Sequence, residues 1–333
     1  MSRSLIVLPD DSAQPILDAI HTAMRSLRIK MFSVSDPRIL NALIGAHRRA
    51  VKIRVMLNPA RRSGEIQNKG ARSVLRAAGI DVLDTNPAFD VTHEKSMVVD
   101  DTRAFVGSLN WEPENFETTR DYAVMTTDPD EVSEVIECFE ADWSRKPFTP
   151  PKSSNLIWCP INGREEIAHF IDSAKHSLFI QNERYQDAII VEHMVSAKLR
   201  GVKVHVMTRP SHSLPAEKLV EGVGNLRIMH DVGIGIHKIK HLKLHAKMLL
   251  ADKSRAIIGS INLSPGSFDR RRELAIRLQE RDVVRRLVKV VHKDWENSHP
   301  LDLSDKELSW GLKTHPKQKE FSQVESAASG LDE

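Results

Sequence analysis

The chain has 333 residues, of which 41% are hydrophobic, 28% are charged and 5% are aromatic, and its net charge is +3. This length is enough for two domains of ordinary size, and no apolar run approaches the ~20 residues that a membrane-spanning helix needs. The only cysteines, Cys138 and Cys159, form no metal-binding spacing, so we expect two reduced, buried thiols.

Strands and helices alternate along both halves of the sequence. The first half is predicted to contain strands at residues 5–8, 29–34 and 51–57 and helices at residues 15–27 and 39–49. The second half is predicted to contain strands at residues 156–158, 177–181 and 202–207 and helices at residues 165–175 and 189–199. This alternation is typical of layered α/β folds rather than of helix bundles or β-sandwiches.

The segment at residues 146–154 is rich in Pro and Ser and is predicted to be a linker. We therefore expect a first half at residues 1–148 and a second half at residues 149–303. Residues 304–333 are polar and lack apolar periodicity, which predicts a partly disordered tail. The apolar run at residues 5–8 is too short for a signal peptide, so we expect a cytoplasmic protein.

One pattern of residue types occurs twice: His-x-Lys, an Asp five residues after the Lys, and then Gly-Ser-x-Asn. Its two copies are His93, Lys95, Asp100, Gly107, Ser108 and Asn110, and His245, Lys247, Asp252, Gly259, Ser260 and Asn262. The interval of 152 residues between the histidines also separates Trp143 from Trp295, each of which follows an Asp. A constant interval of this kind indicates an internal duplication that includes the scaffold.

The residue types of the pattern suit phosphoryl transfer. Imidazole attacks phosphorus or moves a proton near neutral pH, Lys supplies a positive charge for a phosphate oxygen, and Asn and Ser add neutral donors. Residues 91–99 and 242–251 are predicted strands. Alternate residues of a strand share a face, so we expect each histidine and its lysine to point the same way.

The doubled pattern resembles the signature of the phospholipase D superfamily, and the resemblance covers most of the chain. It implies two pseudo-symmetric α/β/α halves, each a mixed sheet flanked by helices, with one active site at their interface. It also implies phosphodiester hydrolysis or transfer through a phosphohistidine, without a metal or other cofactor. By this resemblance His93 is the expected nucleophile and His245 the expected acid and base, although the pseudo-symmetry leaves the reverse assignment open.

The other positions of the pattern are expected to have different roles. Lys95, Lys247, Asn110 and Asn262 are expected to hold the non-bridging oxygens of the transition state. Ser108 and Ser260 are expected to add substrate-binding hydroxyl donors or to shape the turn. Asp100, Asp252, Gly107 and Gly259 are expected to be structural.

An acid follows each motif asparagine by eleven residues: Asp121 in the first copy and Glu273 in the second. A carboxylate that accepts a hydrogen bond from the far nitrogen of an imidazole fixes its tautomer and raises its basicity. We therefore expect each acid to support the histidine of its own motif, Asp121 with His93. The alternative is two acids at the starts of strands that align by chance.

Three histidines, Trp111 and two Asp-Trp pairs are further candidates for a functional or structural role. His237, His241 and His245 have the spacing of a helical zinc site, but His245 belongs to a predicted strand, so no metal is expected. Trp111 either lines the groove or packs beneath its loop. The pairs Asp142-Trp143 and Asp294-Trp295 end predicted amphipathic helices and are expected to anchor the core.

Basic clusters flank the motifs at residues 61–62, 237–247 and 270–272, which suggests a positive rim for phospholipid headgroups or a nucleic-acid backbone. Few aromatic residues are present for base stacking, which favours lipid. We expect an enzyme that cleaves or transfers a phosphatidyl group, similar to phospholipase D or cardiolipin synthase. It would be a monomer that reaches the inner membrane face as a peripheral protein. The alternatives are an endonuclease and a catalytically silent nucleic-acid or membrane binding module.

Overall fold

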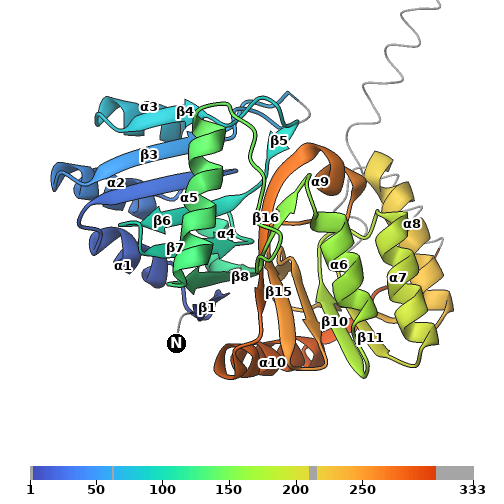
Figure 1. Cartoon of the computed structure of the whole chain (residues 1–333). Coiled ribbons are helices and arrows are strands. Elements are labelled where there is room, and N and C mark those ends of the chain that lie inside the picture. Colours follow the sequence, from blue (N-terminus) through green and yellow to red (C-terminus); the bar gives the residue numbers. More distant parts are fainter. Residues whose placement is uncertain (1–2, 62–63, 210–215, 305–333) are drawn as a thin grey trace, which may run out of the picture.

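The computed structural model describes residues 3–61, 64–209 and 216–304, and it consists of two halves that stand side by side (Figure 1). Each half is a mixed β-sheet with helices on its faces, which confirms the predicted fold class. The predicted tail lies outside the described residues except for Ser304, and the predicted domain boundaries stay predictions.

The sheet of the first half has the strand order β1-β8-β7-β6-β2-β3-β4. These strands are β1 (Arg3–Leu8), β2 (Ser26–Met31), β3 (Lys52–Leu57), β4 (Asp81–Asp84), β6 (Lys95–Val99), β7 (Arg103–Gly107) and β8 (Thr119–Thr126). The pairs β2–β3 and β3–β4 are parallel, and the other pairs along this order are antiparallel.

The sheet of the second half repeats this arrangement, with the order β17-β12-β11-β10-β14-β15-β16 and with β9 paired to β16. These strands are β9 (Leu156–Cys159), β10 (Ser177–Gln181), β11 (Lys203–Met207), β12 (Gly235–Ile239), β14 (Met248–Ala251), β15 (Arg255–Gly259), β16 (Arg271–Leu278) and β17 (Ser298–Pro300). Strands β10, β11 and β12 are parallel, like β2, β3 and β4 of the first half. The repeat seen in the sequence is therefore a repeat of topology.

The helices occupy corresponding places in the two halves (Figure 1). They are α1 (Gln14–His21), α2 (Pro37–Arg48), α3 (Lys69–Ala77), α4 (Pro113–Glu117) and α5 (Pro129–Trp143), followed by α6 (Gly163–Asp172), α7 (Ala188–Leu199), α8 (Ala216–Asp231), α9 (Pro265–Arg270) and α10 (Arg281–Glu296). No helix within the described ranges has the length and apolar character needed to cross a membrane.

The longest predicted helix, residues 15–27, is shorter in the structure. Helix α1 ends at His21, and β2 begins at Ser26. The reason lies in Asp100, whose carboxylate accepts hydrogen bonds from the backbone N–H groups of Met24, Arg25 and Ser26 at 2.9, 2.6 and 2.9 Å. Those three N–H groups point to a carboxylate across the sheet, so they are not available to continue the helix.

Asp252 does the same in the second half. Its carboxylate accepts from the backbone N–H groups of Lys175, His176 and Ser177 at 3.0, 2.7 and 3.0 Å. Asp100 and Asp252 also share a left-handed backbone, with φ of 53° and 52°. The prediction that these two motif residues are structural is confirmed.

Replacing Asp252 by Asn is expected to lower the free energy of unfolding by about 1–2 kcal/mol at pH 7, because a charged acceptor of three N–H bonds becomes a neutral one. Burial alone would raise the pKa of Asp252, but its three backbone hydrogen bonds hold that pKa below the ordinary value. The carboxylate therefore contributes stability above the unfolded-state pKa of about 3.9, and this contribution is lost as the pH falls. Urea unfolding at pH 7 and pH 3 should show a smaller difference between Asp252→Asn and the parent chain at the lower pH. An equal difference at both values would contradict this role.

Three apolar clusters form the core. The first lies within the first half and the second within the second half. The third joins them, because it contains Val7 and Val124 from the first half together with Phe179 and Ile258 from the second. The two halves therefore share a hydrophobic core and form one packed body.

Two buried ion pairs also join the halves. Arg120 of β8 contacts Asp294 of α10 through Nε and Nη2, at 2.8 and 2.9 Å. Arg272 of β16 contacts Asp142 of α5 through the same two nitrogens, at 3.1 Å each. The two aspartates that precede the tryptophans thus anchor the interface between the halves, where an anchor of the hydrophobic core is expected from the sequence. Trp143 and Trp295 themselves are half-buried.

Both cysteines, Trp111 and Gly259 lie in the buried interior. Cys138 and Cys159 are buried and form no disulfide. Trp111 is fully buried with its ring 6.4 Å from that of Phe105, so it packs beneath the loop and does not line the groove. A Cβ atom at Gly259 would lie 2.3 Å from the carbonyl oxygen of Leu274. This glycine therefore allows β15 and β16 to approach closely, as expected.

Candidate active site

Each motif histidine lies between two strands, and not within one as predicted. Strand β5 (Val91–Thr92) ends just before His93, and β6 begins at Lys95. Likewise β13 (Lys243–Leu244) ends just before His245, and β14 begins at Met248. The continuous strands predicted at residues 91–99 and 242–251 are therefore wrong at the histidines.

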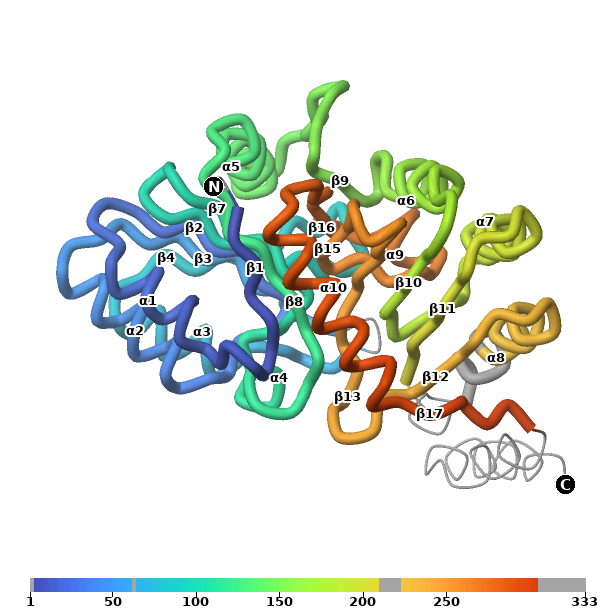
Figure 2. Tube along the Cα trace, turned by 90° about the horizontal axis from the view of Figure 1, so that it is seen from below, coloured from blue at the N-terminus to red at the C-terminus, as the bar shows by residue number. Residues whose placement is uncertain are grey.

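The short strands leave their own half and join the sheet of the other. Strand β5 runs parallel to β16 of the second half (Figure 1). Strand β13, labelled in Figure 2, runs parallel to β8 of the first half. The backbone N–H of His93 donates to the carbonyl of Arg272 at 2.9 Å, and that of His245 donates to the carbonyl of Arg120 at 3.1 Å. Each histidine is therefore held by the half to which it does not belong.

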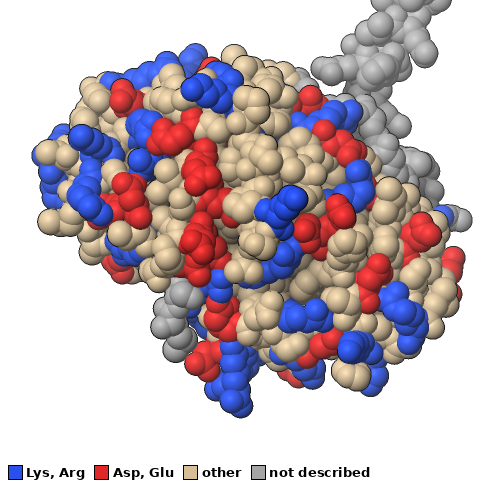
Figure 3. Space-filling view, in the orientation of Figure 1, with Lys and Arg blue, Asp and Glu red and all other residues tan. Residues whose placement is uncertain are grey.

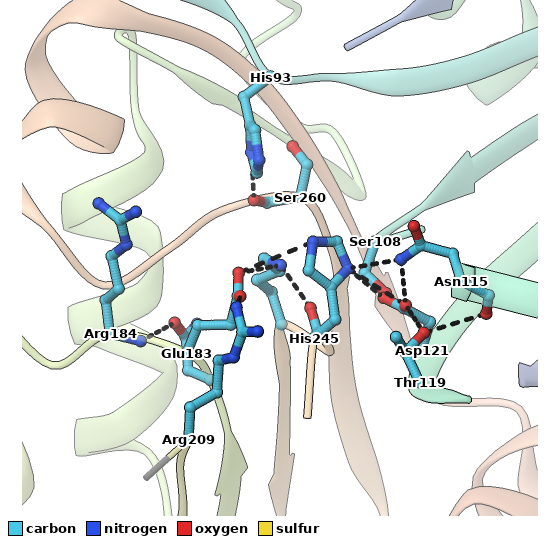
Figure 4. Close-up of polar contacts among 12 residues, drawn as sticks. His93, Ser108, Asn115, Thr119, Asp121, Glu183, Arg184, Arg209, His245 and Ser260 are labelled. Atoms are coloured by element: carbon cyan, nitrogen blue, oxygen red, sulfur yellow. Dashed lines mark hydrogen bonds and ion pairs between the residues drawn. The ribbon is translucent and has the colours of Figure 1, made fainter. Parts of the chain in front are cut away.

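This exchange decides which acid meets which histidine. The Nδ1 atom of His93 lies 2.9 Å from Oε2 of Glu273. The Nδ1 atom of His245 lies 2.8 Å from Oδ1 of Asp121 (Figure 4). The predicted pairing of Asp121 with His93 within one motif is wrong. Each acid does contact a motif histidine, as the equal spacing indicates. Because β5 and β13 pair with the opposite sheet, each acid contacts the histidine of the other motif.

The contacts of His93 indicate its tautomer. Its Nδ1 atom faces two acceptors, Oε2 of Glu273 and the carbonyl oxygen of Ser260 at 3.1 Å. A proton is therefore expected on Nδ1, which leaves the Nε2 lone pair free. Burial lowers the pKa of His93 well below its ordinary value, and the positive charges of Lys95, Lys247 and Arg271 lower it further. The neutral imidazole is the form that can attack phosphorus.

The Asp121 carboxylate is fully buried and accepts several hydrogen bonds. Ser108 Oγ and Thr119 Oγ1 each donate to it at 2.6 Å, and Asn115 Nδ2 donates at 3.1 Å (Figure 4). Burial alone would raise the pKa of Asp121, but His245, Lys247 and Ser108 hold it below its ordinary value. An ionised carboxylate fixed at Nδ1 stabilises a positive charge on His245.

Glu273 differs from Asp121 in its charge balance. Burial raises the pKa of Glu273 above its ordinary value, and Arg271 and Lys95 offset this only in part. The two histidine–acid pairs are thus alike in geometry but not in electrostatics. The surroundings of His93 favour its neutral imidazole.

The motif serines lie behind the histidines. Ser108 and Ser260 are completely buried. The hydroxyl of Ser108 donates to Asp121, and the hydroxyl of Ser260 donates to the carbonyl of Leu274 at 3.3 Å. Neither serine lines the pocket. The prediction that they bind substrate is therefore corrected: they hold the acid and the neighbouring strand.

The motif lysines are buried beside the histidines. Lys95 Nζ donates to the carbonyl of His93 at 2.5 Å, and Lys247 Nζ donates to the carbonyl of His245. Burial and the charge of Lys247 lower the pKa of Lys95 well below its ordinary value. Neither lysine lines the pocket that both histidines line, and the backbone between each histidine and its lysine is not the regular strand predicted from the sequence.

A pocket of about 470 Å³ opens in front of both histidines. The amides of Asn110 and Asn262 line it from the two halves. Their Oδ1 atoms have no hydrogen-bond partner among the described residues. The amide N–H groups of these two side chains are donors that can bind a phosphate oxygen at the pocket. The pocket brings together His93, His245, Asn110 and Asn262, four of the eight predicted catalytic residues.

The pocket also contains charged residues that the motifs do not reveal. They are Arg61, Glu65, Glu112, Glu114, Glu183, Arg184, Arg209, Lys243 and Arg271. Of these, Glu183 lies nearest to the chemistry, because its Oε2 atom is 2.7 Å from Lys247 Nζ and 3.8 Å from His245 Nε2. A comparison of the two sequence repeats could have singled it out, since Phe32 occupies the matching place in the first half.

One cluster of potential metal ligands lies behind the site. Glu94, Cys138 and Asp142 are buried close together, but Lys30 Nζ lies among them, 3.0 Å from Glu94 Oε2, 3.4 Å from Cys138 Sγ and 2.7 Å from Asp142 Oδ2. The ammonium already supplies the positive charge that these groups require. This donor set therefore does not fit a metal ion.

His237, the first histidine of the zinc-like four-residue spacing, has other partners. Its ring stacks on Trp295 at 3.9 Å, and its Nδ1 atom shares a hydrogen bond of 2.7 Å with Ser298 Oγ. His245 belongs to the pocket, where Asp121 holds it. The four-residue spacing thus does not place these imidazoles on one helix face.

The sequence matches a family model described as "Cardiolipin synthase, PLD-like domain" at residues 16–143 and again at residues 167–295. Among curated proteins, a polyphosphate kinase of Vibrio parahaemolyticus is 24% identical over 304 residues, which are 85% of this chain and 42% of that protein. A human mitochondrial cardiolipin hydrolase is 31% identical over 151 residues, which are 44% of this chain and 58% of that protein. The chain thus spans less than two thirds of these relatives.

A solved structure of phosphatidylserine synthase from Haemophilus influenzae has the same fold over nearly the whole length of both chains. The TM-score is 0.71, and the match covers 98% of this chain and 94% of the other at 11% identity. Identity at this level supports the fold alone.

Proposed function

The chain belongs to the phospholipase D superfamily, and from this premise we propose that it cleaves or transfers a phosphatidyl group through a phosphohistidine. The observation that carries the proposal is the pair of imidazoles at one pocket, each with its Nδ1 atom held by a buried carboxylate from the other repeat. Both Nε2 atoms are then left for chemistry.

In the first step, the Nε2 atom of neutral His93 attacks phosphorus. The bond between phosphorus and the leaving oxygen breaks, and this oxygen takes the proton from Nε2 of His245. The low pKa of His93, caused by burial and nearby cations, supports its role as nucleophile. The carboxylate of Asp121 at Nδ1 supports the protonated form of His245.

In the second step, His245 removes a proton from water or an alcohol. The resulting oxygen attacks the phosphorus of the phosphohistidine, the phosphorus–nitrogen bond breaks, and both histidines return to their initial states. Lys95, Lys247 and the amides of Asn110 and Asn262 would stabilise the non-bridging oxygens in both steps. No metal takes part in this scheme.

Two observations favour a lipid substrate. The curated relative with 31% identity is named a cardiolipin hydrolase, and the family description names cardiolipin synthase. Phe32 is the only aromatic residue besides the histidines that lines the described pocket, so base stacking has little support. Ile66, which is 72% exposed and adjoins the pocket residue Glu65, offers an apolar contact for a peripheral approach to a membrane.

A second candidate is a phosphoanhydride substrate such as polyphosphate. The relatives that match both halves of the chain are named polyphosphate kinases. Five cations line the pocket: Arg61, Arg184, Arg209, Lys243 and Arg271. Acidic and basic side chains are interspersed on the face in Figure 3, so the outer surface shown there favours no single polyanion.

The substrate class is tested by incubating the protein separately with labelled phosphatidylglycerol, single-stranded DNA and polyphosphate. We expect turnover of the lipid alone, and none by the His93→Ala variant. Cleavage of DNA without lipid turnover would establish a nuclease, and turnover of polyphosphate alone would establish the second candidate. A lack of turnover with all three would favour a binding module. Addition of ethanol separates hydrolysis from transfer, because an enzyme-bound phosphatidyl group is captured as phosphatidylethanol.

A further inference from the structure

The two repeats differ at the position that faces each motif lysine. In the first half this position is Phe32, whose ring centre lies 4.9 Å from Lys95 Nζ and 4.9 Å from the His93 ring. In the second half it is Glu183, whose carboxylate contacts Lys247. One lysine is thus covered by an uncharged ring and the other by an anion.

Both oxygens of Glu183 are fixed. Oε1 accepts from Arg209 at 2.6 Å, and Oε2 accepts from Lys247 at 2.7 Å. Figure 4 shows this carboxylate between Arg209 and His245. Burial alone would raise the pKa of Glu183, but Lys247, His245 and Arg209 hold it well below its ordinary value. The carboxylate is therefore a permanent negative charge next to Nε2 of His245.

A bound phosphate would lie close to this charge. In the proposed mechanism Lys247 would hold a non-bridging oxygen and His245 would protonate the leaving oxygen. Glu183 contacts Lys247 Nζ and lies 3.8 Å from His245 Nε2. A carboxylate about 5 Å from a phosphate repels it in proportion to the charge of the phosphate. A diester carries one negative charge, whereas a monoester near pH 8 carries about two.

We propose that Glu183 is a charge-selecting residue, which neutralises Lys247 so that the pocket accepts a singly charged phosphodiester and rejects phosphate groups of higher charge. This inference rests on the proposed function for the position of the phosphate. It narrows that function to singly charged phosphodiesters. It favours phospholipid over the phosphoanhydride chain, whose terminal group carries more charge. Phe32 imposes no such selection on the Lys95 side.

The test measures binding and not turnover, so its failure is distinguishable from failure of the proposed function. The probes are dimethyl phosphate, a monoanion, and methyl phosphate, a dianion at pH 8, and their dissociation constants are measured by ³¹P NMR titration. In Glu183→Gln we expect the affinity for dimethyl phosphate to rise about threefold. The affinity for methyl phosphate should rise by about the square of that, roughly tenfold, because the Coulomb energy doubles with the charge.

Two controls locate the effect. Glu114→Gln removes the same charge from the same pocket, but Glu114 pairs with Lys243 and does not contact Lys247. Its effect on methyl phosphate should stay below about threefold. In a Lys247→Ala background, Glu183→Gln should still raise the affinity for methyl phosphate more than that for dimethyl phosphate, because the carboxylate repels the phosphate directly and Arg209 still contacts it.

The inference is overturned if Glu183→Gln changes both affinities equally, if Glu114→Gln has the same effect, or if the gain disappears without Lys247. Because Glu183 is buried between two cations, the melting temperature of each variant is recorded first. If Glu183→Gln does not fold, Glu183→Ala replaces it with the same expected order of affinities. The smaller side chain leaves Lys247 and Arg209 open to water.

Discussion

Replacing His93 by Ala is expected to lower kcat by about 10⁴-fold or more, because the reaction loses its nucleophile and no other described side chain at Nε2 of His93 can replace it. The measurement is steady-state turnover of the lipid identified in the substrate assay. The melting temperature is recorded alongside, because His93 is buried and its Nδ1 atom contacts the buried Glu273. Loss of activity with an intact fold separates the chemical role from a structural one.

Replacing His245 by Ala is expected to have a different signature. A natural alcohol needs a proton to leave, so its cleavage should fall by about 10²- to 10⁴-fold. A p-nitrophenyl phosphodiester leaves without that proton, so formation of the phosphohistidine should be much less affected, and the intermediate should accumulate. Rapid-quench labelling with ³²P detects it. A labelled His93→Ala variant together with an unlabelled His245→Ala variant would reverse the two roles.

The second large effect is expected at the interface between the halves. Arg120→Ala should lower the free energy of unfolding by about 3–5 kcal/mol, because it removes the cationic partner of the buried Asp294. Arg272→Ala is the matched control in the other repeat. There Lys30 still contacts Asp142, so the loss should be smaller, about 1–3 kcal/mol.

Guanidinium unfolding of the two variants provides the measurement. Equal losses would mean that Lys30 does not compensate for the missing arginine, and a loss below about 1 kcal/mol for Arg120→Ala would mean that the pair is dispensable. The pKa directions of the two aspartates agree with the expected order. Burial raises the pKa of Asp294, whereas Lys30 and Arg272 overcome burial to lower that of Asp142 to about 2.

Most of the scaffold is predictable from the sequence because the patterns involved are local. Alternating apolar residues place β3, β10 and β11 within one or two residues of their observed bounds. The helix predicted at residues 15–27 fails for a non-local reason. The residue that ends it, Asp100, lies about 75 residues away in the sequence.

The site was predictable in its residues but not in its pairing. The doubled motif identifies both histidines, both lysines and both asparagines, and the matched spacing identifies Asp121 and Glu273. Nothing in the spacing reveals that β5 and β13 pair with the opposite sheet, since a two-residue strand has too little pattern to indicate its neighbour. Glu183 was missed for a related reason, because it lies in neither motif and reaches the site only through the fold.

The exchange of β5 and β13 limits how this molecule can move. A hinge motion that separated the halves would break the backbone hydrogen bonds of His93 and His245 to the opposite sheet, and each imidazole would part from its acid. Domain opening is therefore an unsuitable route for release of product. The spacing of the two imidazoles is set by sheet geometry before any ligand arrives, so the positioning of both motif histidines is completed during folding.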